Sequence, residues 1–434
     1  MKQTRPGWVE AWFKTLVERS AFRVESIPLS TSTEWSLSEG AICHKSGHFF
    51  NIVGLQWTDP SGQTIAQPLI EQREIGMLGF LMRQGEAGNE LLVHAKIEPG
   101  NVGIVQMAPT CQATYSNSSL FHGGEPPPYS DLFLTRKLDV IHESLQSEQG
   151  TRFLDKRNCN MLAVARQLVL ERDTHRWMPA DEFLELLSID YLVNTDARSV
   201  LICSSWHDLV GRKPFSRFRS PFSIDLEKSA CCDGRLISTS DLKRHMQTMR
   251  SRVAVERVIP LEQLEGWSLT DEGLRPREGG PFIVRQIKVI AHGREVSSWD
   301  QPIIDSKGEG RVDLVCGRID GLLHFMFRPQ VEAGLSNDVE LGPTVTIGPG
   351  EKIDENQLQD WSGAELISAT HLSDEGGRFF LDRSLYRVLD AGQVDGKAAG
   401  GCWLSLKQVR QLLDEGGWFT NEARSALAQL LVWL

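Results

Sequence analysis

The chain has 434 residues, a length that usually corresponds to two or three domains. Its hydrophobic fraction of 41% and charged fraction of 24% are those of an ordinary globular protein with a sizeable core. The formal net charge of −11 opposes binding to a phosphate backbone or an anionic membrane surface, so neither nucleic acid nor a membrane is an expected partner.

The beginning of the chain and the cysteines indicate where the protein is expected to reside. Residues 1–14 mix charged and aromatic side chains and lack the apolar core of a signal peptide. No stretch approaches the ~18 consecutive apolar residues of a membrane span. The eight cysteines form no CxxC pair, so neither a zinc knuckle nor a disulfide framework is indicated. We therefore expect a cytoplasmic chain with reduced thiols.

Apolar periodicity predicts strands first and helices later in the chain. Short β-leaning runs predict strands at residues 49–53, 91–97 and 102–107. Helical spacing of apolar residues predicts a helix over 180–187 and another from 196 to 201. Residues 211–235 show no clear period and are interpreted as a linker, after which strands are expected again at 282–291 and 322–327. This order favours an α/β or α+β unit of about 200 residues with a mixed sheet.

The same motifs occur twice in the same order, which is the sign of an internal repeat. Ile27-Pro28-Leu29 returns as Ile259-Pro260-Leu261, and Gln67-Pro68-Leu69 returns as Gln301-Pro302-Ile303. Glu148-Gln149-Gly150 is paired with Glu375-Gly376-Gly377, and Ala197-Arg198-Ser199 with Ala423-Arg424-Ser425. The offsets stay between 226 and 234 residues. The sequence therefore predicts a tandem duplication, with one domain at residues 1–225 and the other at 235–434.

The motifs of several enzyme classes are missing. The chain has no GxGxxG, GxxxxGK[ST], HExxH or GxSxG sequence, so a Rossmann cofactor, a P-loop, a zincin site and an α/β-hydrolase elbow lose their support. The histidines show no metal-ligand spacing with one another or with cysteines. We expect neither a cofactor nor a metal.

The duplication permits an internal comparison of candidate site residues. A polar residue kept in both halves is a candidate for maintaining the fold, as with Glu98 and Glu332, whereas one present in a single half is a better candidate for chemistry. In this alignment Lys96 is paired with Gln330, Asn101 with Leu335, Gln112 with Thr346, Asn117 with Glu351, Arg152 with Phe379, and Arg157-Asn158 with Ser384-Leu385. The first half therefore carries the predicted site, and Gln67 and Gln146 are added as neighbouring polar candidates.

Strand alternation places His94, Lys96 and Glu98 on one face of the sheet. An acid, a base and a cation on one face are what general acid–base chemistry with an anionic intermediate requires. Each residue also has a purely structural interpretation: Glu98 as a fold-maintaining acid, Lys96 as part of a solvated face, and His94 as an ordinary half-buried histidine.

Longer motifs carry a resemblance to a known family. They include His48-Phe49-Phe50, Gln67-Pro68-Leu69-Ile70-Glu71-Gln72, Ala95-Lys96 with Glu98-Pro99-Gly100-Asn101, Ser298-Trp299-Asp300-Gln301-Pro302, and Glu375-Gly376-Gly377-Arg378-Phe379. At these residues, and in this order over nearly the whole chain, the sequence resembles the NDP-hexose 2,3-dehydratases of deoxysugar biosynthesis.

The resemblance implies two tandem Nudix-like domains without the metal-binding Nudix box, each with a mixed sheet flanked by helices, in a homodimer. The implied substrate is dTDP-4-keto-6-deoxy-glucose, and the implied product is a 3,4-diketo-2,6-dideoxy sugar nucleotide consumed by a partner 3-ketoreductase. The second copy departs from the family's EPG-type motif at Gln330 and Ala333.

Residue roles come from the internal comparison and not from the resemblance. Glu98 or His94 is the expected base, Lys96 the expected partner of the enolate, and Arg152, Arg157 and Asn158 the expected diphosphate contacts. Two other functions stay open: a metal-dependent nucleotide-sugar hydrolase on the same units, and a non-catalytic nucleotide-sugar-binding protein.

Overall fold

The computed structural model describes residues 4–59, 61–86, 88–114, 126–232, 234, 236–250, 254–292, 296–351, 361–396 and 400–434. Within these residues each repeat contributes a large sheet of seven strands. In the first repeat they are β6 (Gly76–Gln84), β7 (Asn89–Ile97), β8 (Val105–Ala108), β9 (Cys111–Ala113), β10 (Leu138–Ser147), β12 (Arg157–Ala165) and β13 (His175–Pro179). In the second they are β19 (Gly310–Ile319), β20 (Leu322–Val331), β21 (Val339–Gly342), β22 (Val345–Ile347), β23 (Glu365–Ser373), β24 (Arg383–Gln393) and β25 (Cys402–Leu404).

The direction of the strands confirms the α/β (α+β) class with mixed sheets. In each large sheet one parallel pair lies among antiparallel strands: β12 with β6 in the first repeat, and β24 with β19 in the second. The runs expected at 49–53 and 91–97 belong to strands, but the run expected at 102–107 becomes a strand only from Val105. The residues before Val105 form a tight turn in which Ile104 takes a φ of 72°.

Two smaller sheets lie beside the large ones, and they exchange strands. One contains β2 (Trp35–Ser38), β3 (Ala41–His44), β4 (Asn51–Thr58), β5 (Thr64–Glu71), β11 (Phe153–Leu154) and, from the second repeat, β14 (Ala254–Ile259). The other contains β15 (Trp267–Thr270), β16 (Gly273–Pro276), β17 (Phe282–Ile290), β18 (Ser298–Ser306) and, from the first repeat, β1 (Arg23–Ile27). Ile259 pairs with Gly54, and Ile27 pairs with Gln286. The first strand of each repeat therefore completes the small sheet of the other.

The helices of the described residues are α1 (Gly7–Ser20), α3 (Ser130–Leu134), α4 (Ala180–Glu185), α5 (Thr195–Cys203), α6 (Trp206–Val210), α7 (Pro221–Cys231), α8 (Thr239–Arg250), α10 (Leu406–Glu415) and α11 (Asn421–Ala428). The predicted helices at 180–187 and 196–201 correspond to α4, which ends in a 3-10 turn, and to α5. The prediction of a linker over 211–235 is wrong for its second half. The Ser220 side chain caps the first turn of α7 and Pro221 occupies a first-turn position, which are standard signals for a helix start.

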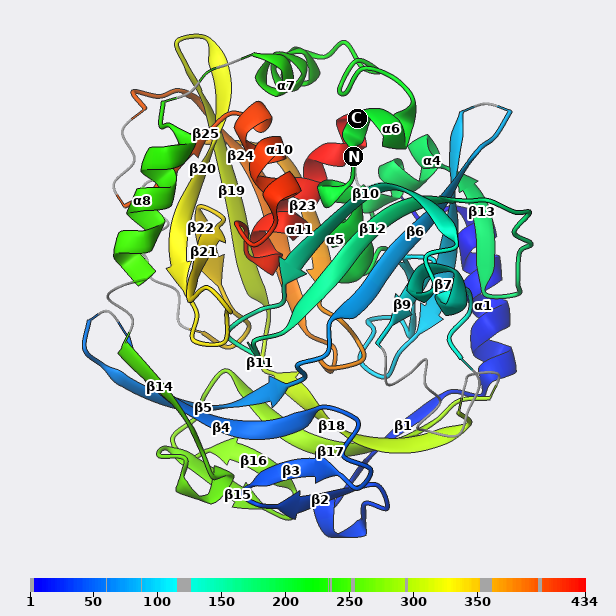
Figure 1. The fold of residues 1–434 in the computed structure, drawn as a ribbon, viewed down its shortest axis with the longest axis vertical. Helices are drawn as coiled ribbons and strands as arrows, with labels where there is room; N and C mark the ends of the chain where they lie inside the picture. Colours follow the sequence, from blue (N-terminus) through cyan, green and yellow to red (C-terminus); the bar gives the residue numbers. More distant parts are fainter. Residues whose placement is uncertain are drawn as a thin grey trace.

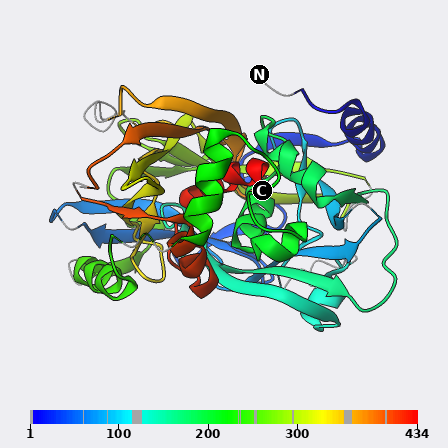
Figure 2. The ribbon, with the colours of Figure 1, turned by 90° about the horizontal axis from the view of Figure 1, so that it is seen from above.

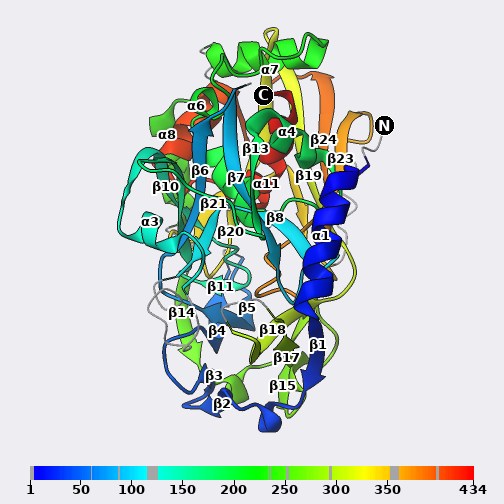
Figure 3. The same cartoon turned by 90° about the vertical axis from the view of Figure 1, so that its right-hand side faces the viewer.

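The two repeats share one hydrophobic core, which runs through α5 and α11. Leu201 of α5 and Leu427 of α11 are both fully buried in it, as are Leu91 and Leu323 of the two large sheets. Figure 1 shows these two helices between the large sheets, with the small sheets below, and Figure 2 shows the same arrangement from above. Figure 3 shows α1 running along the side of the molecule towards β1.

Equivalent arginines tie the two helices together. Arg198 Nε donates to Ser425 Oγ at 3.2 Å, and Arg424 Nε donates to Ser199 Oγ at 2.9 Å. Both guanidinium groups are buried and both also bond to backbone carbonyls, so these charges are satisfied in the interior. Arg198 and Arg424, which are kept in both repeats, therefore help to hold the two helices together. The division into domains at 1–225 and 235–434 stays a prediction.

Candidate active site

A cavity of about 710 Å³ opens between the two repeats. The first repeat lines it with the β2–β3 hairpin, with β7 and the turn that follows, and with β9. The second repeat lines it with residues 298–301 of β18 and with the turn at 375–378. The strand exchange brings these segments together, since β18 pairs with β17, which in turn pairs with β1.

Lys96 and Glu98 form an ion pair at the end of β7. Lys96 Nζ lies 2.7 Å from Glu98 Oε1, and the two side chains are only 12% and 5% exposed. The Asn101 side chain holds the turn after them, because its Nδ2 donates to the carbonyl oxygens of Lys96 and Ile104 at 3.1 Å each. Glu98 Oε2 is buried and accepts no hydrogen bond within the described residues. The pair therefore places a cation and an acceptor oxygen side by side in the cavity.

His94 lies two residues earlier on the same face, as strand alternation predicts. Its ring stacks on that of His175, with centroids 4.1 Å apart and planes 12° apart. Burial lowers the pKa of His175 to about 4, and its Nε2 bonds to the Thr110 carbonyl oxygen at 3.1 Å. His94 thus packs against a neutral imidazole on β13.

Gln112 of β9 connects the first repeat to the turn of the second. Its Nε2 donates to Glu375 Oε1 at 3.3 Å, while its Oε1 accepts from Asn194 Nδ2 at 3.4 Å. Asn194 is itself fixed as the N-cap of α5, through its Oδ1 and the Ala197 amide. These contacts orient the Gln112 amide so that an N–H faces the Glu375 carboxylate.

Further carboxyl groups line the interior of the cavity, and their pKa values are raised. Burial, reinforced by the nearby Glu375 charge, raises the pKa of Glu148 to about 7. Burial and the charges of Glu375 and Glu148 raise the pKa of Asp196 well above its ordinary value. Burial also raises the pKa of Glu375, although Arg378 and the lysines oppose this. Burial lowers the pKa of Lys156 to about 8. Protons therefore sit on some of these groups near neutral pH.

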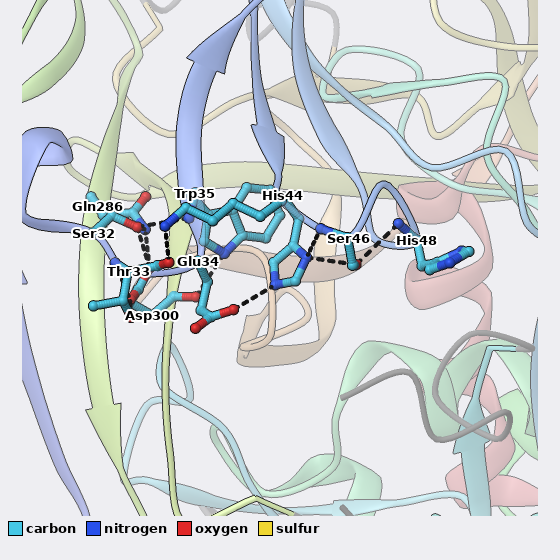
Figure 4. A network of polar contacts seen from close by, with 10 residues as sticks. Ser32, Thr33, Glu34, Trp35, His44, Ser46, His48, Gln286 and Asp300 are labelled. Atoms are coloured by element: carbon cyan, nitrogen blue, oxygen red, sulfur yellow. Dashed lines mark hydrogen bonds and ion pairs between the residues drawn. The ribbon is translucent and has the colours of Figure 1, made fainter. Parts of the chain in front are cut away.

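The rim of the cavity is held by Asp300, a β18 residue that supports the turn before β2. Its carboxylate accepts from the Ser32 hydroxyl, from the Thr33 amide at 3.1 Å and hydroxyl at 3.0 Å, and from Gln286 Nε2 at 2.9 Å. Figure 4 shows this network together with His44, whose Nδ1 bonds to Ser46 Oγ at 2.7 Å. The second repeat thus fixes the hairpin that lines the mouth of the first-repeat cavity.

The structure brings five of the predicted site residues together. His94, Lys96, Glu98, Gln112 and Asn158 line the cavity. Asn158 Nδ2 donates to Glu148 Oε1, and Asn421 Nδ2 of α11 donates to Glu148 Oε2 at 2.9 Å. Asn117 lies outside the described residues.

The other predicted residues lie away from the cavity wall. Asn101 holds the turn described above, and Gln67 Nε2 donates to the Thr151 carbonyl oxygen at 3.0 Å. Gln146 is 2% exposed and bonds to the Leu413 carbonyl oxygen. The Arg152 guanidinium lies over the Phe282 ring, 4.3 Å from its centroid, and Arg157 is exposed at the start of β12. The structure therefore does not gather Arg152, Arg157 and Asn158 into one cluster.

One part of the internal alignment is wrong by a single residue. The Ile70 amide bonds to the Arg152 carbonyl oxygen, and the Ile304 amide bonds to that of Arg378 in the same way. Arg152 is therefore equivalent to Arg378 and not to Phe379, so it is present in both halves. The same shift pairs Gln149 with Glu375, and the strand register pairs Asn158 with Ser384, since Gly76 and Gly310 are their partners.

The correct register exposes residues that the sequence comparison missed. Glu375 is a carboxylate in one half and an amide, Gln149, in the other, which is the signal that selected Lys96. In the corrected alignment Lys156 is likewise equivalent to Asp382, so the lysine is present in only one half. Arg378 also lines the cavity, with its guanidinium 4.2 Å from the centroid of the Phe50 ring. The one-residue error concealed Glu375 and Lys156, whereas Arg378 is equivalent to Arg152 and is missed because it is kept in both halves.

Comparison with known proteins agrees with this arrangement of two repeats. The family model described as NDP-hexose 2,3-dehydratase matches residues 7–204 and again residues 239–430. The chain belongs to this family. Each match covers one repeat, and together they include both walls of the cavity.

Similar proteins carry names that agree with the family. A dTDP-4-dehydro-6-deoxy-alpha-D-glucopyranose 2,3-dehydratase of Streptomyces violaceoruber is 33% identical over 99% of this chain and 97% of its own length. Proteins of the same name from Amycolatopsis orientalis and Saccharopolyspora spinosa are 32% and 31% identical, over 98% and 96% of this chain and 90% of their own lengths.

The described part of the chain contains neither a metal-binding cluster nor a membrane-spanning helix. Among those residues, no group of three or more His, Cys, Asp or Glu side chains is arranged to hold a metal ion. No helix in the same set of residues is long and apolar enough to cross a membrane.

Proposed function

We propose that this chain removes water across C2 and C3 of dTDP-4-dehydro-6-deoxy-glucose, the substrate in the names of its three relatives. The observation that carries the proposal is the Lys96–Glu98 pair, which is 2.7 Å apart and nearly buried in a cavity large enough for a sugar nucleotide. The reaction needs a base for a carbon-bound proton and a cation for an oxyanion. The pair supplies both.

The proposed reaction begins at C3, whose proton is acidified by the C4 ketone. Glu98 takes that proton, the electron pair moves towards the C4 oxygen, and Lys96 stabilises the enolate oxygen. The electrons then form the C2–C3 double bond as the C2–O bond breaks, and the hydroxyl takes a proton from an acid in the cavity and leaves as water. The resulting enol gains a proton at C2 and loses one from O3, giving the 3,4-diketo-2,6-dideoxy product. His94 is the alternative base.

Charge distribution suggests how the substrate lies. The interior of the cavity carries the acids Glu98, Glu148, Asp196 and Glu375 beside the cations Lys96, Lys156 and Arg378, so it offers a diphosphate no excess of positive charge. Lys45 of the hairpin and Lys288 of β17 also line the cavity, and Lys288 is exposed. We place the diphosphate towards these two lysines and the hexose beside Lys96 and Glu98. This replaces the earlier expectation for Arg152 and Arg157.

The remaining expectations also belong to the proposal. We propose that the two repeats are Nudix-like domains, at 1–225 and 235–434, and that the enzyme acts as a homodimer in the cytoplasm. Because a 3,4-diketo sugar is reactive, we propose that a 3-ketoreductase consumes the product. The proposed reaction uses no cofactor.

The test is incubation with dTDP-4-dehydro-6-deoxy-glucose in deuterated water, with and without a chelator, followed by mass spectrometry. We expect loss of one water with deuterium entering the sugar, at the same rate in both samples. Binding without turnover would favour a non-catalytic binding protein. Metal-dependent release of nucleotide would favour a hydrolase. Glu98→Gln and His94→Gln separate the two candidate bases, because only the replacement of the true base abolishes exchange of the C3 proton.

A further inference from the structure

Two turns from different repeats are joined by backbone hydrogen bonds beside the Lys96–Glu98 pair. The Gly100 amide donates to the Gly376 carbonyl oxygen at 2.7 Å, and the Leu381 amide donates to that of Gly100 at 2.9 Å. A Cβ atom on Gly100 would lie 1.6 Å from the Phe379 carbonyl oxygen, so only glycine permits this approach. The backbone contact holds the turn that carries Glu98 against the turn that carries Glu375.

The side chains of these two glutamates converge on the same point. A Cβ atom built on Gly377 would lie 2.8 Å from Glu375 Oε1 and 3.3 Å from Glu98 Oε1. Both carboxyl groups line the cavity. Two acids from different repeats therefore face the same part of the cavity.

The two carboxyl groups have different neighbours. Glu98 has the Lys96 ammonium 2.7 Å away, whereas Glu375 receives a neutral amide N–H from Gln112 at 3.3 Å. Burial and the negative charge of Glu98 act together to raise the pKa of Glu375. A pair of acids whose surroundings differ in this way suits one base and one acid.

The equivalent turn of the other repeat shows what the fold itself requires. There the Gly334 amide donates to the Gly150 carbonyl oxygen at 2.9 Å, and the Asp155 amide donates to that of Gly334 at 2.8 Å. The backbone arrangement is the same, but Gln149 stands where Glu375 stands. An amide therefore satisfies the structure of this turn, and the carboxyl group of Glu375 serves another purpose.

We infer that Glu375 is the acid that protonates the departing C2 hydroxyl, so that the second repeat completes the catalytic site of the first. The inference rests on the proposed function. The Glu375 proton goes to the C2 oxygen as the C2–O bond breaks and water forms, while Glu98 holds the proton from C3 and then releases it to solvent. Glu375 recovers its proton from solvent before the next turnover.

Two other acids line the cavity, and the contacts of one of them, Glu148, make it less suited to this role. Both oxygens of Glu148 accept hydrogen bonds from asparagine amides, Asn158 on one side and Asn421 on the other. Asp196, at the beginning of α5, lines the cavity and is as buried as Glu98, so burial does not exclude it. Asp196→Asn is therefore the variant that tests the nearest competitor.

The experiment separates proton abstraction from loss of water. In deuterated water we expect Glu375→Gln to exchange the C3 proton of dTDP-4-dehydro-6-deoxy-glucose while dehydration falls about 10²–10⁴-fold. We expect Glu98→Gln to lose both. A 2-deoxy-2-fluoro substrate should restore elimination by Glu375→Gln, because fluoride leaves without a proton. Glu332→Gln, the change in the second repeat that is equivalent to Glu98→Gln, should behave like the wild type.

Several outcomes would overturn the inference. They are wild-type dehydration by Glu375→Gln, loss of C3 exchange together with dehydration in a folded Glu375→Gln, or the expected behaviour appearing in Asp196→Asn instead. If Glu375→Gln does not fold, Glu375→Asp decides: it should keep partial dehydration and an alkaline decline in rate, and full activity would contradict the role. A wild-type protein that leaves the substrate unchanged would instead refute the proposed function.

Discussion

The turn that follows β7 in the first repeat and the turn that follows β20 in the second have the same backbone arrangement, but different charged groups surround them. In the first repeat Glu98 lies beside Lys96 at 2.7 Å. In the second, Glu332 occupies the same place and Gln330 replaces the lysine. Burial and the charges of Glu422 and Glu340 raise the pKa of Glu332 well above its ordinary value.

This difference separates the contribution of the acid from that of the cation. An acid at this turn is compatible with both repeats, so its presence alone does not indicate chemistry. Without a lysine beside it, the buried carboxyl group of Glu332 keeps a raised pKa even though Arg152 opposes the shift, so it is less suited to act as a base. With Lys96 present, the same position holds an ion pair in a cavity. Duplication preserved the turn, and a few substitutions around it decided which copy carries the proposed chemistry.

The largest expected effect comes from separating the repeats. Expressed alone, residues 1–232 and 233–434 should each fail to unfold cooperatively, because β1 and β14 complete each other's sheets and the main core includes residues of both. Co-expression of the two pieces should restore a folded complex. Thermal unfolding followed by circular dichroism measures this. A single piece with a sharp transition would contradict the shared core.

The next largest effect is expected when Lys96 is replaced by glutamine, the residue at the equivalent position of the second repeat. Lys96→Gln should lower kcat/KM about 10²–10³-fold, because the enolate loses its cation. Stability should change little, since Gln330 is accommodated at the equivalent position. Steady-state kinetics measure the loss, with Gln330→Thr as the control that should retain activity. Near-normal turnover by Lys96→Gln would remove the cation from the mechanism.

A third effect concerns the pH dependence of stability at Glu148. Its folded pKa of about 7 lies above the ordinary value of 4.5, so between these values the folded state binds more protons than the unfolded state. The free energy of unfolding therefore falls as the pH rises from about 4.5 to 7, by on the order of 3 kcal/mol for this group.

Glu148→Gln should remove that contribution. The stability difference between wild type and variant should favour the wild type more at pH 5 than at pH 8, as measured by urea unfolding at both values. Glu143→Gln on the same strand is the control, because the Arg136 hydrogen bond lowers the pKa of Glu143 and its charge is constant over this range. Equal differences at pH 5 and pH 8 for Glu148→Gln would mean that Glu148 does not titrate there.

The smallest effect concerns the amide that faces Glu375. Gln112→Thr copies Thr346 of the second repeat and removes the hydrogen bond to Glu375 Oε1. We expect dehydration to fall about 5–10-fold, the value of one ordinary hydrogen bond, mainly through kcat. Exchange at C3 should be unchanged. A loss confined to KM would instead assign Gln112 to substrate binding.

Local patterns predicted the parts of the site that lie on one strand. The alternation of side chains along β7 places His94, Lys96 and Glu98 on one face, and the structure has all three in the cavity. Predictions for isolated polar residues were less accurate. Arg152 and Gln146 are polar because they satisfy groups inside the fold, and the sequence does not distinguish such a residue from one that faces a ligand.

By itself, the sequence determined the duplication, the family and the Lys96–Glu98 pair, because repeats, motifs and strand alternation are properties of neighbouring residues. Only the tertiary structure decided that the first strands are exchanged and that Glu375 faces Glu98. The contact between Gly100 and Gly376 joins positions far apart in the chain, and Glu-Gln-Gly and Glu-Gly-Gly can be aligned in two ways. Hydrogen bonds between strands select one of them, since each amide has a single geometrically suitable partner.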